Sequence, residues 1–199
     1  MSVAVMTDTP QLDPKTSALL VMDFQTSIVD LFASEKEPLL TRTASLIAVA
    51  RKAGMQIIYV VVGFRAGYPE VSPKNQSFAA IRGSGRFVLG SAGSEVHAAV
   101  APEAGDVVVT KHRVSAFAGT DLAVILRANG IETLVLAGIA TSGVVLSTVR
   151  HAADADYRLV VVADCCSARD PEVHRVLTEK VFLRQATVTS AEGVIRALG

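Results

Sequence analysis

The chain has 199 residues, of which 50% are hydrophobic and 19% charged, and this composition excludes an intrinsically disordered protein. Its 19 lysines and arginines balance 19 aspartates and glutamates, so no excess of positive charge favours binding to nucleic acid or to an anionic membrane. The length predicts a single domain over 1–199 with a full hydrophobic core.

The N-terminal segment, 1–16, is expected to be an arm. It has no basic stretch followed by a long apolar core, and no apolar run in the chain approaches the roughly 18–20 residues of a membrane helix. Cys165 and Cys166 are neighbours, a spacing that disfavours a disulfide between them and fits a reducing compartment. We therefore expect a cytoplasmic protein that does not span a membrane.

Runs of branched apolar residues, bounded by turn-forming residues, predict buried parallel strands. These runs lie at 17–24, 56–62, 106–110, 133–138 and 158–164. A shorter run at 186–190 predicts an edge strand.

Amphipathic helical patterns lie between the strands, at 41–54, 119–130, 142–155 and 170–185. Gly54 and Gly130 are typical of residues that follow a helix C-terminus, and Asp170 with Pro171 predicts an N-cap and a first helical residue. The alternation of strands and helices predicts an α/β fold with three layers, α/β/α, around a mostly parallel six-stranded sheet.

One long irregular stretch, 63–95, is rich in Gly, Ser and Pro and is too long for a plain connection. We expect it to form a lid or binding wall over the C-terminal edge of the sheet. Its Arg65, Tyr68, Arg82 and Arg86 are candidates for lining a pocket.

Two charged residues follow predicted strands, Asp23 after the first and Lys111 after the third. Ligands of open parallel sheets bind beyond the carboxyl ends of the strands, so both side chains lie where a site is expected. A buried carboxylate needs a partner, and Lys111 is the obvious cation. The pair is either a structural ion pair or an acid/base pair with coupled pKa values.

Other polar groups near the strand ends have simpler interpretations. Ser142 is favoured as a helix N-cap over a nucleophile. Cys165 and Cys166 are favoured as buried structural thiols over a reactive centre. The scattered histidines do not have the spacing of a zinc site.

Three blocks of the chain resemble the isochorismatase-like hydrolase superfamily, also called cysteine hydrolases. They are "ALLVMDFQ" (18–25), "VVTKHRVSAFAGTDL" (108–122) and "LVLAGIATSGVVLSTVRHAADADYRLVVVADCC" (134–166). The resemblance implies a Rossmann-like six-stranded parallel sheet, a small-molecule substrate, and a homo-oligomer such as a dimer.

The resemblance also implies a catalytic site of an aspartate, a lysine and a cysteine. Asp23 and Lys111 match the first two, whereas Val144 occupies the position of the family nucleophile. Cys165 and Cys166 lie about twenty residues further along the chain and do not replace it.

The backbone around Val144 is implied to face the substrate. The resemblance predicts a cis peptide bond between Ile139 and Ala140, with the N–H groups of Ala140 and Val144 forming an oxyanion hole. Thr141, Ser142 and Gly143 complete this stretch.

Phe117, Ser115 and Arg65 are further candidates for lining the pocket. The metal-binding segment of the amidase members corresponds here to "GFRAGYPEV", which has no histidine, so we expect neither a metal nor another cofactor.

Without a thiol, the leading hypothesis is a hydrolase that acts on a small organic acid or ether without a covalent intermediate. Asp23 would be the acid/base and Lys111 its electrostatic partner. The alternatives are a catalytically silent binding or oligomer-forming member, and a serine-dependent hydrolase that uses Ser142 or Ser115.

Overall fold

The computed structural model describes residues 10–33 and 35–199, so the first part of the predicted arm, 1–9, lies outside the described residues. Six strands form one sheet in the order β3-β2-β1-β4-β5-β6, and every neighbouring pair is parallel. Their bounds are β1 (Ser17–Met22), β2 (Gln56–Val62), β3 (Val107–Lys111), β4 (Thr133–Ile139), β5 (Arg158–Ser167) and β6 (Thr187–Thr189).

The sheet confirms the predicted fold class. Every residue of the two central strands, β1 and β4, is buried, because helices cover both faces of the sheet. The short strand β6 lies at one edge, as its sequence predicts.

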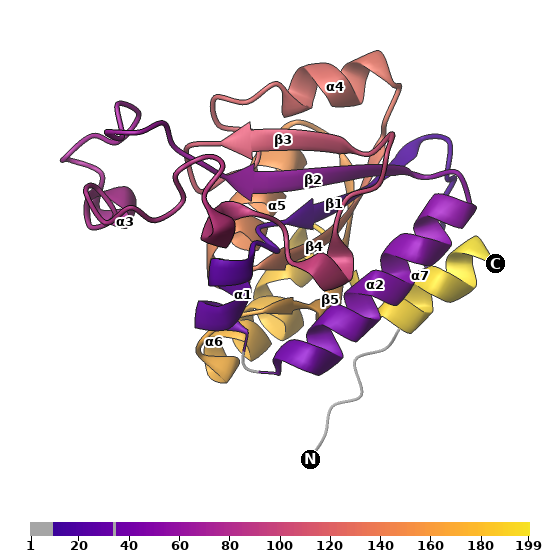
Figure 1. Ribbon diagram of the computed structural model, residues 1–199. Helices are drawn as coiled ribbons and strands as arrows, with labels where there is room; N and C mark the ends of the chain where they lie inside the picture. Colours follow the sequence, from indigo (N-terminus) through magenta and orange to yellow (C-terminus); the bar gives the residue numbers. More distant parts are fainter. Residues whose placement is uncertain (1–9, 34) are drawn as a thin grey trace.

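The helices are divided between the two faces of the sheet (Figure 1). Their bounds are α1 (Thr26–Phe32), α2 (Lys36–Lys52), α3 (Gln76–Ala79), α4 (Leu122–Ala128), α5 (Leu146–Asp154), α6 (Pro171–Val176) and α7 (Ala191–Leu198). Side chains of α1, α2 and α7 pack into one hydrophobic core, and those of α4 and α5 pack into the other.

The predicted helix at 142–155 has a different beginning. Its first part is a wide π-helical turn, Thr141–Val145, which we call the β4–α5 turn, and regular α-helix starts only at Leu146. The predicted helix at 170–185 is likewise α-helical only over α6 and continues as irregular helical turns to Arg184. The Asp170 carboxylate accepts hydrogen bonds from two backbone N–H groups at the start of α6, which confirms the predicted N-cap.

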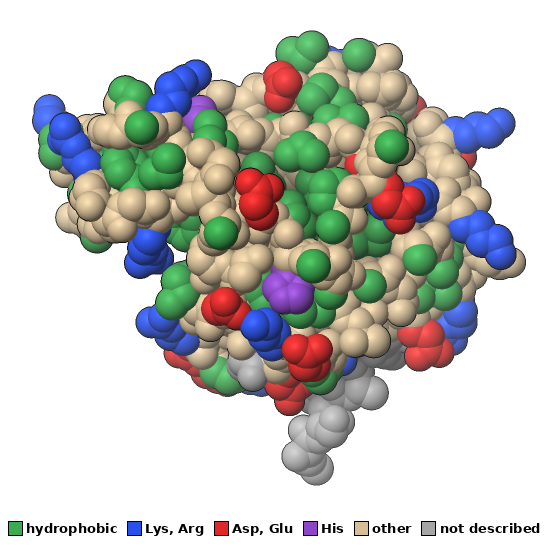
Figure 2. Space-filling model, in the orientation of Figure 1, with side chains coloured by type: hydrophobic (Ala, Val, Ile, Leu, Met, Phe, Trp, Pro, Cys, Tyr) green, Lys and Arg blue, Asp and Glu red, His purple; other side chains and the backbone are tan. Residues whose placement is uncertain are grey.

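The long segment 63–95 projects beyond the carboxyl ends of β2 and β3 and contains the short helix α3 (Figure 1). Backbone hydrogen bonds fix its base, because Phe64 N donates to Phe87 O over 2.8 Å and Leu89 N donates to Phe64 O over 3.0 Å. Lys and Arg side chains stand out on the projecting lobe (Figure 2). Between 63 and 95 the sequence has four basic residues, Arg65, Lys74, Arg82 and Arg86, and two acidic residues, Glu70 and Glu95.

Among the described residues, no helix is both long enough and apolar enough to cross a membrane.

Candidate active site

The order of the strands predicts where a ligand binds. The chain winds outward in opposite directions from β1 and β4, so the connections that leave these two neighbours diverge and open a crevice at their carboxyl ends. A cavity of about 410 Å³ lies there. It is lined by Asp23, Ile28, Phe32, Val62, Ser77, Phe78, Ile81, Arg86, Phe87, Lys111, Val114, Ile139, Ala140, Ser142, Gly143 and Val144.

The predicted partners Asp23 and Lys111 meet in this cavity. Lys111 Nζ lies 3.0 Å from Asp23 Oδ2, and the two residues are only 2% and 5% exposed. Lys111 Nζ also donates a hydrogen bond to Arg113 O over 3.1 Å. Asp23 Oδ1 is buried and has no hydrogen-bond partner among the described residues. Lys111 therefore holds one carboxylate oxygen, and the other oxygen is shielded from solvent as well.

The protonation of Asp23 is shifted by its surroundings. Burial raises the pKa of Asp23 because desolvation disfavours the charged form, and the positive charge of Lys111 offsets only part of this effect. Asp23 thus holds a proton at higher pH than an exposed aspartate does, which suits a group that donates and recovers protons.

The end of β1 is fixed by Gln25, which the sequence analysis did not identify. Its side chain is fully buried, and its Nε2 donates to Val62 O over 2.8 Å and to Ser94 O over 2.7 Å. Its Oε1 accepts from Val62 N over 2.8 Å. These bonds join the carboxyl ends of β1 and β2 and hold Asp23 in place. A glutamine so soon after a buried strand is the sequence signal for this role.

The β4–α5 turn forms another wall of the cavity. The Ile139–Ala140 peptide bond is cis, the conformation that the family resemblance implies. Ala140 O accepts hydrogen bonds from Gly143 N over 2.9 Å and from Val145 N over 3.4 Å. Val144 lines the cavity and is 2% exposed.

The two hydroxyl-bearing residues of this turn, Thr141 and Ser142, have different environments. Thr141 is fully buried outside the cavity lining, and its Oγ1 lies 2.9 Å from Nδ1 of His174. Ser142 is exposed and lines the cavity. The residue that precedes the turn as its N-cap is Ala140, with no side-chain hydrogen bond, so the prediction that Ser142 caps a helix is wrong. The π-helical turn starts one residue earlier than the sequence pattern indicates.

The described cavity lining does not include Phe117, Ser115 or Arg65, the other residues predicted to line a pocket. Phe117 turns away and stacks on His151 with ring centroids 4.7 Å apart. Ser115 Oγ accepts a hydrogen bond from Phe117 N, and Arg65 forms an ion pair with Glu70. Of the lid residues proposed from the sequence, Arg86 does line the cavity.

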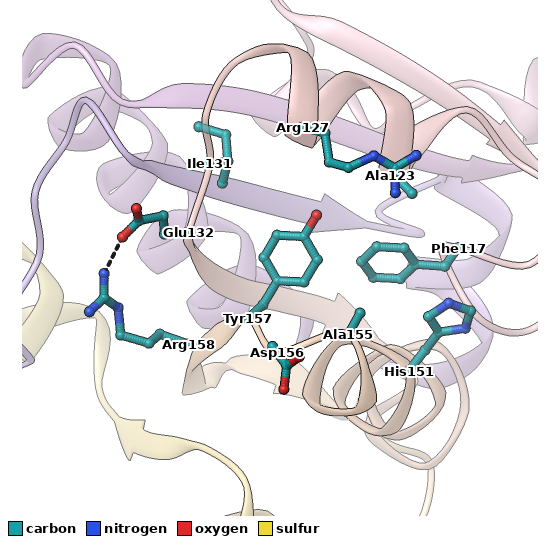
Figure 3. A pocket seen from close by; sticks show the side chains of 10 residues that line it. All are labelled: Phe117, Ala123, Arg127, Ile131, Glu132, His151, Ala155, Asp156, Tyr157 and Arg158. Atoms are coloured by element: carbon teal, nitrogen blue, oxygen red, sulfur yellow. Dashed lines mark hydrogen bonds and ion pairs between the residues drawn. The ribbon is translucent and has the colours of Figure 1, made fainter.

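Phe117 belongs to a separate groove of about 580 Å³ between α4 and α5 (Figure 3). The ion pair in this groove, between Arg158 and Glu132, is largely exposed to solvent, with the side chains 72% and 62% accessible. Water screens such an exposed pair, so this groove has no buried ion pair like the one in the Asp23 cavity among its described lining residues.

The two cysteines are free thiols and are buried. Burial raises the pKa of Cys165 to about 12 and raises that of Cys166 as well. Both thiols therefore stay protonated at neutral pH, and neither is among the described residues that line the cavity. Within the described chain, no group of three or more His, Cys, Asp or Glu residues is placed to hold a metal ion.

Known proteins resemble the chain over almost its whole length. The model of the isochorismatase domain matches residues 17–193. The uncharacterized isochorismatase family protein YecD of Escherichia coli O157:H7 is 33% identical, over 94% of this chain and 99% of that protein. The ureidoacrylate amidohydrolase RutB of Methylobacterium radiotolerans is 31% identical, over 94% of this chain and 81% of that enzyme.

A solved structure agrees with these matches. The N-carbamoylsarcosine amidase of Thermoplasma acidophilum superposes with a TM-score of 0.73 and is 34% identical, over 89% of this chain and 97% of that one. The parallel sheet and the cavity at the carboxyl ends of β1 and β4 are consistent with these full-length matches. The chain belongs to the isochorismatase family of hydrolases.

Proposed function

We propose that the protein hydrolyses a small organic substrate without a covalent thiol intermediate, with Asp23 as acid/base and Lys111 as its electrostatic partner. The observation that carries this proposal is the buried Asp23–Lys111 pair in a cavity that Val144 also lines. The sequence resemblance, in addition, aligns Val144 with the family's nucleophile position. Valine has no group that attacks a carbonyl, so a thioester route has no starting atom at this position.

The Asp23 carboxyl group lines the cavity, and Lys111 holds only one of its two oxygens, Oδ2. With its pKa raised by burial, the carboxyl group can donate a proton to a substrate such as a vinyl ether and take one back from the attacking water. Protonation of the double bond makes the adjacent carbon electrophilic, water adds to it, and the resulting hemiketal releases the alcohol. Lys111 stabilises the carboxylate that forms when Asp23 gives up its proton.

The cavity favours a small substrate with an apolar body and an anionic group. Phe32, Phe78, Ile81 and Phe87 supply apolar walls, and Arg86 supplies a cation. The excess of basic residues on the projecting lobe adds a positive field that attracts anions.

Turnover by the wild type and by Asp23→Asn tests the acid/base role. We expect hydrolysis of isochorismate, or of another small vinyl ether or ester in a substrate panel. General acid/base catalysis contributes about 100-fold or more, so Asp23→Asn should lower kcat by at least that factor. Turnover that is unchanged in Asp23→Asn would remove Asp23 from the mechanism. A wild type that turns over nothing in the panel would favour the catalytically silent alternative.

Val144→Cys tests whether the rest of a thiol-dependent site is assembled. We expect the variant to gain amidase activity, for example toward ureidoacrylate, with a covalent acyl-enzyme detected by mass spectrometry after acid quenching. Val144→Ala is the matched control, since it also reduces the side chain but adds no thiol. A folded Val144→Cys protein with neither activity nor adduct would contradict the proposed arrangement of Asp23, Lys111 and the turn.

A serine-dependent hydrolase is the second candidate, because Ser142 lines the cavity and does not cap the turn. Labelling by a fluorophosphonate probe that Ser142→Ala abolishes would support it. Labelling that persists in Ser142→Ala, or its absence in an active wild type, would exclude Ser142 as the nucleophile.

A further inference from the structure

One side chain outside the cavity holds the β4–α5 turn from behind. His174 lies on α6, far along the chain from the turn, and its Nδ1 is 2.9 Å from Thr141 Oγ1. Thr141 is the first residue of the turn and is fully buried, so its hydroxyl needs a partner inside the protein. His174 is the hydrogen-bond partner that the described structure gives this hydroxyl.

The direction of this hydrogen bond depends on the protonation of His174. Burial lowers the pKa of His174, with a smaller opposite effect from Glu179, so the ring is neutral at neutral pH. A neutral ring with its proton on Nε2 offers the Nδ1 lone pair, and the Thr141 hydroxyl donates to it. In a protonated ring, Nδ1 carries a hydrogen and donates instead, which leaves the Thr141 proton without its acceptor.

We propose that His174 is a positioning residue for the β4–α5 turn. In its neutral form it accepts the Thr141 hydroxyl proton and fixes the backbone that presents Gly143 and Val144 to the cavity. The inference rests on the proposed function only where activity is the readout.

The charges around His174 come from several elements. A small cavity of about 190 Å³ behind the turn is lined by His174 together with Glu35, Arg42, Asp164 and Cys166. Arg42 Nε lies 3.8 Å from Asp164 Oδ2, and Glu179 forms an ion pair with Arg175. Burial keeps Cys166 neutral because it raises the pKa of that thiol. Because these charges are paired with one another, desolvation remains the largest influence on the pKa of the His174 ring.

Substitutions at both ends of the bond separate positioning from bulk packing. His174→Asn retains an acceptor near the place of Nδ1 but does not titrate, and His174→Leu retains volume but has no acceptor. Thr141→Val removes the hydroxyl with little change of shape, and Thr141→Ser retains it. The backbone amide signals of Gly143 and Val144 in ¹H–¹⁵N NMR spectra report the turn without any substrate.

We expect these two amide signals to move in His174→Leu and Thr141→Val and to stay near their wild-type positions in His174→Asn and Thr141→Ser. In the wild type they should shift with pH together with the His174 ring signals, and in His174→Asn this titration should disappear. With a substrate in hand, His174→Leu should lower kcat about fivefold, the equivalent of one neutral hydrogen bond, with little change in KM. His174→Asn should restore kcat and lose the acid limb that His174 contributes to the pH profile.

Amide signals of Gly143 and Val144 that are the same in folded His174→Leu and in the wild type, at every pH, would overturn the proposal. This result does not depend on turnover. If instead the signals respond as expected and no substrate is hydrolysed, the positioning role stands and the proposed hydrolytic function fails.

Discussion

At the scale of single residues, the site depends on a carboxylate in an unusual backbone position. Asp23 has φ +58°, in the left-handed region that few residues other than glycine adopt, directly after the last residue of β1. Its N–H still donates to Val60 O over 2.8 Å, so the backbone remains attached to the sheet while it turns toward the crevice. Such conformations persist where the surroundings enforce them, and they concentrate at functional sites.

The raised pKa of Asp23 predicts a specific dependence of stability on pH. The folded state binds this proton more tightly than the unfolded chain, whose pKa is near 3.8. The stabilising contribution is thus fully present below that value and is lost as the pH rises through the higher folded-state pKa. We expect the difference in free energy of unfolding, wild type minus Asp23→Asn, to fall as the pH rises from about 4.

Urea denaturation of both proteins at a series of pH values measures this difference. A difference that rises with pH would show that Lys111 lowers the pKa of Asp23 more than burial raises it. The pair would then act as a structural ion pair, the other interpretation of its sequence.

Sequence patterns predict residues that are tied to strands better than residues in long loops. Asp23 and Lys111 were predicted because a parallel sheet brings the carboxyl ends of its strands to one edge. Arg65 and Phe117 lie outside the described cavity lining, and each belongs to an irregular segment whose path is decided by tertiary contacts. The bond between Thr141 and His174 links positions 33 residues apart and leaves no local pattern.

At the scale of elements, helix α6 carries His174, the partner of Thr141, four residues after the N-cap Asp170. We expect Asp170→Ala to lower the free energy of unfolding by about 1 kcal/mol, since two N–H groups lose their acceptor. Asp170→Asn retains a side-chain oxygen and should lose much less. Urea denaturation distinguishes the two variants, and an Asp170→Ala protein as stable as the wild type would show that the cap contributes no stability.

The strongly patterned elements were predicted well, and the short ones were not. Runs of branched residues gave all six strands to within a few residues, because burial on both faces requires such runs. Helix α1 was missed because it spans seven residues and starts after Gln25, whose side chain does not cap it. Helix α7 spans eight residues and contains Gly193, a weak helix former, so packing against α2 rather than propensity determines it.

At the scale of the whole molecule, the two cysteines report on global folding. Cys165 and Cys166 are adjacent on β5, and because side chains alternate along a strand they belong to the cores on opposite faces of the sheet. They are 0% and 5% exposed. A thiol reagent should therefore leave the native protein unlabelled on the timescale of minutes and label both cysteines after denaturation.

Labelling by 5,5′-dithiobis(2-nitrobenzoic acid), with and without guanidinium chloride, measures this accessibility. Rapid labelling of the native wild type would show that Cys165 or Cys166 is reactive and would reopen a thiol mechanism.

The β4–α5 turn also offers an entry point for enzyme engineering. Groups other than the side chain at 144 hold its shape, since Ala140 O receives the N–H groups of Gly143 and Val145 and Thr141 is bonded to His174, whereas position 144 lines the cavity. A library that varies only position 144 would thus sample nucleophiles, acids and apolar groups on one constant scaffold. Differences in activity among its members could then be attributed to the reacting group itself.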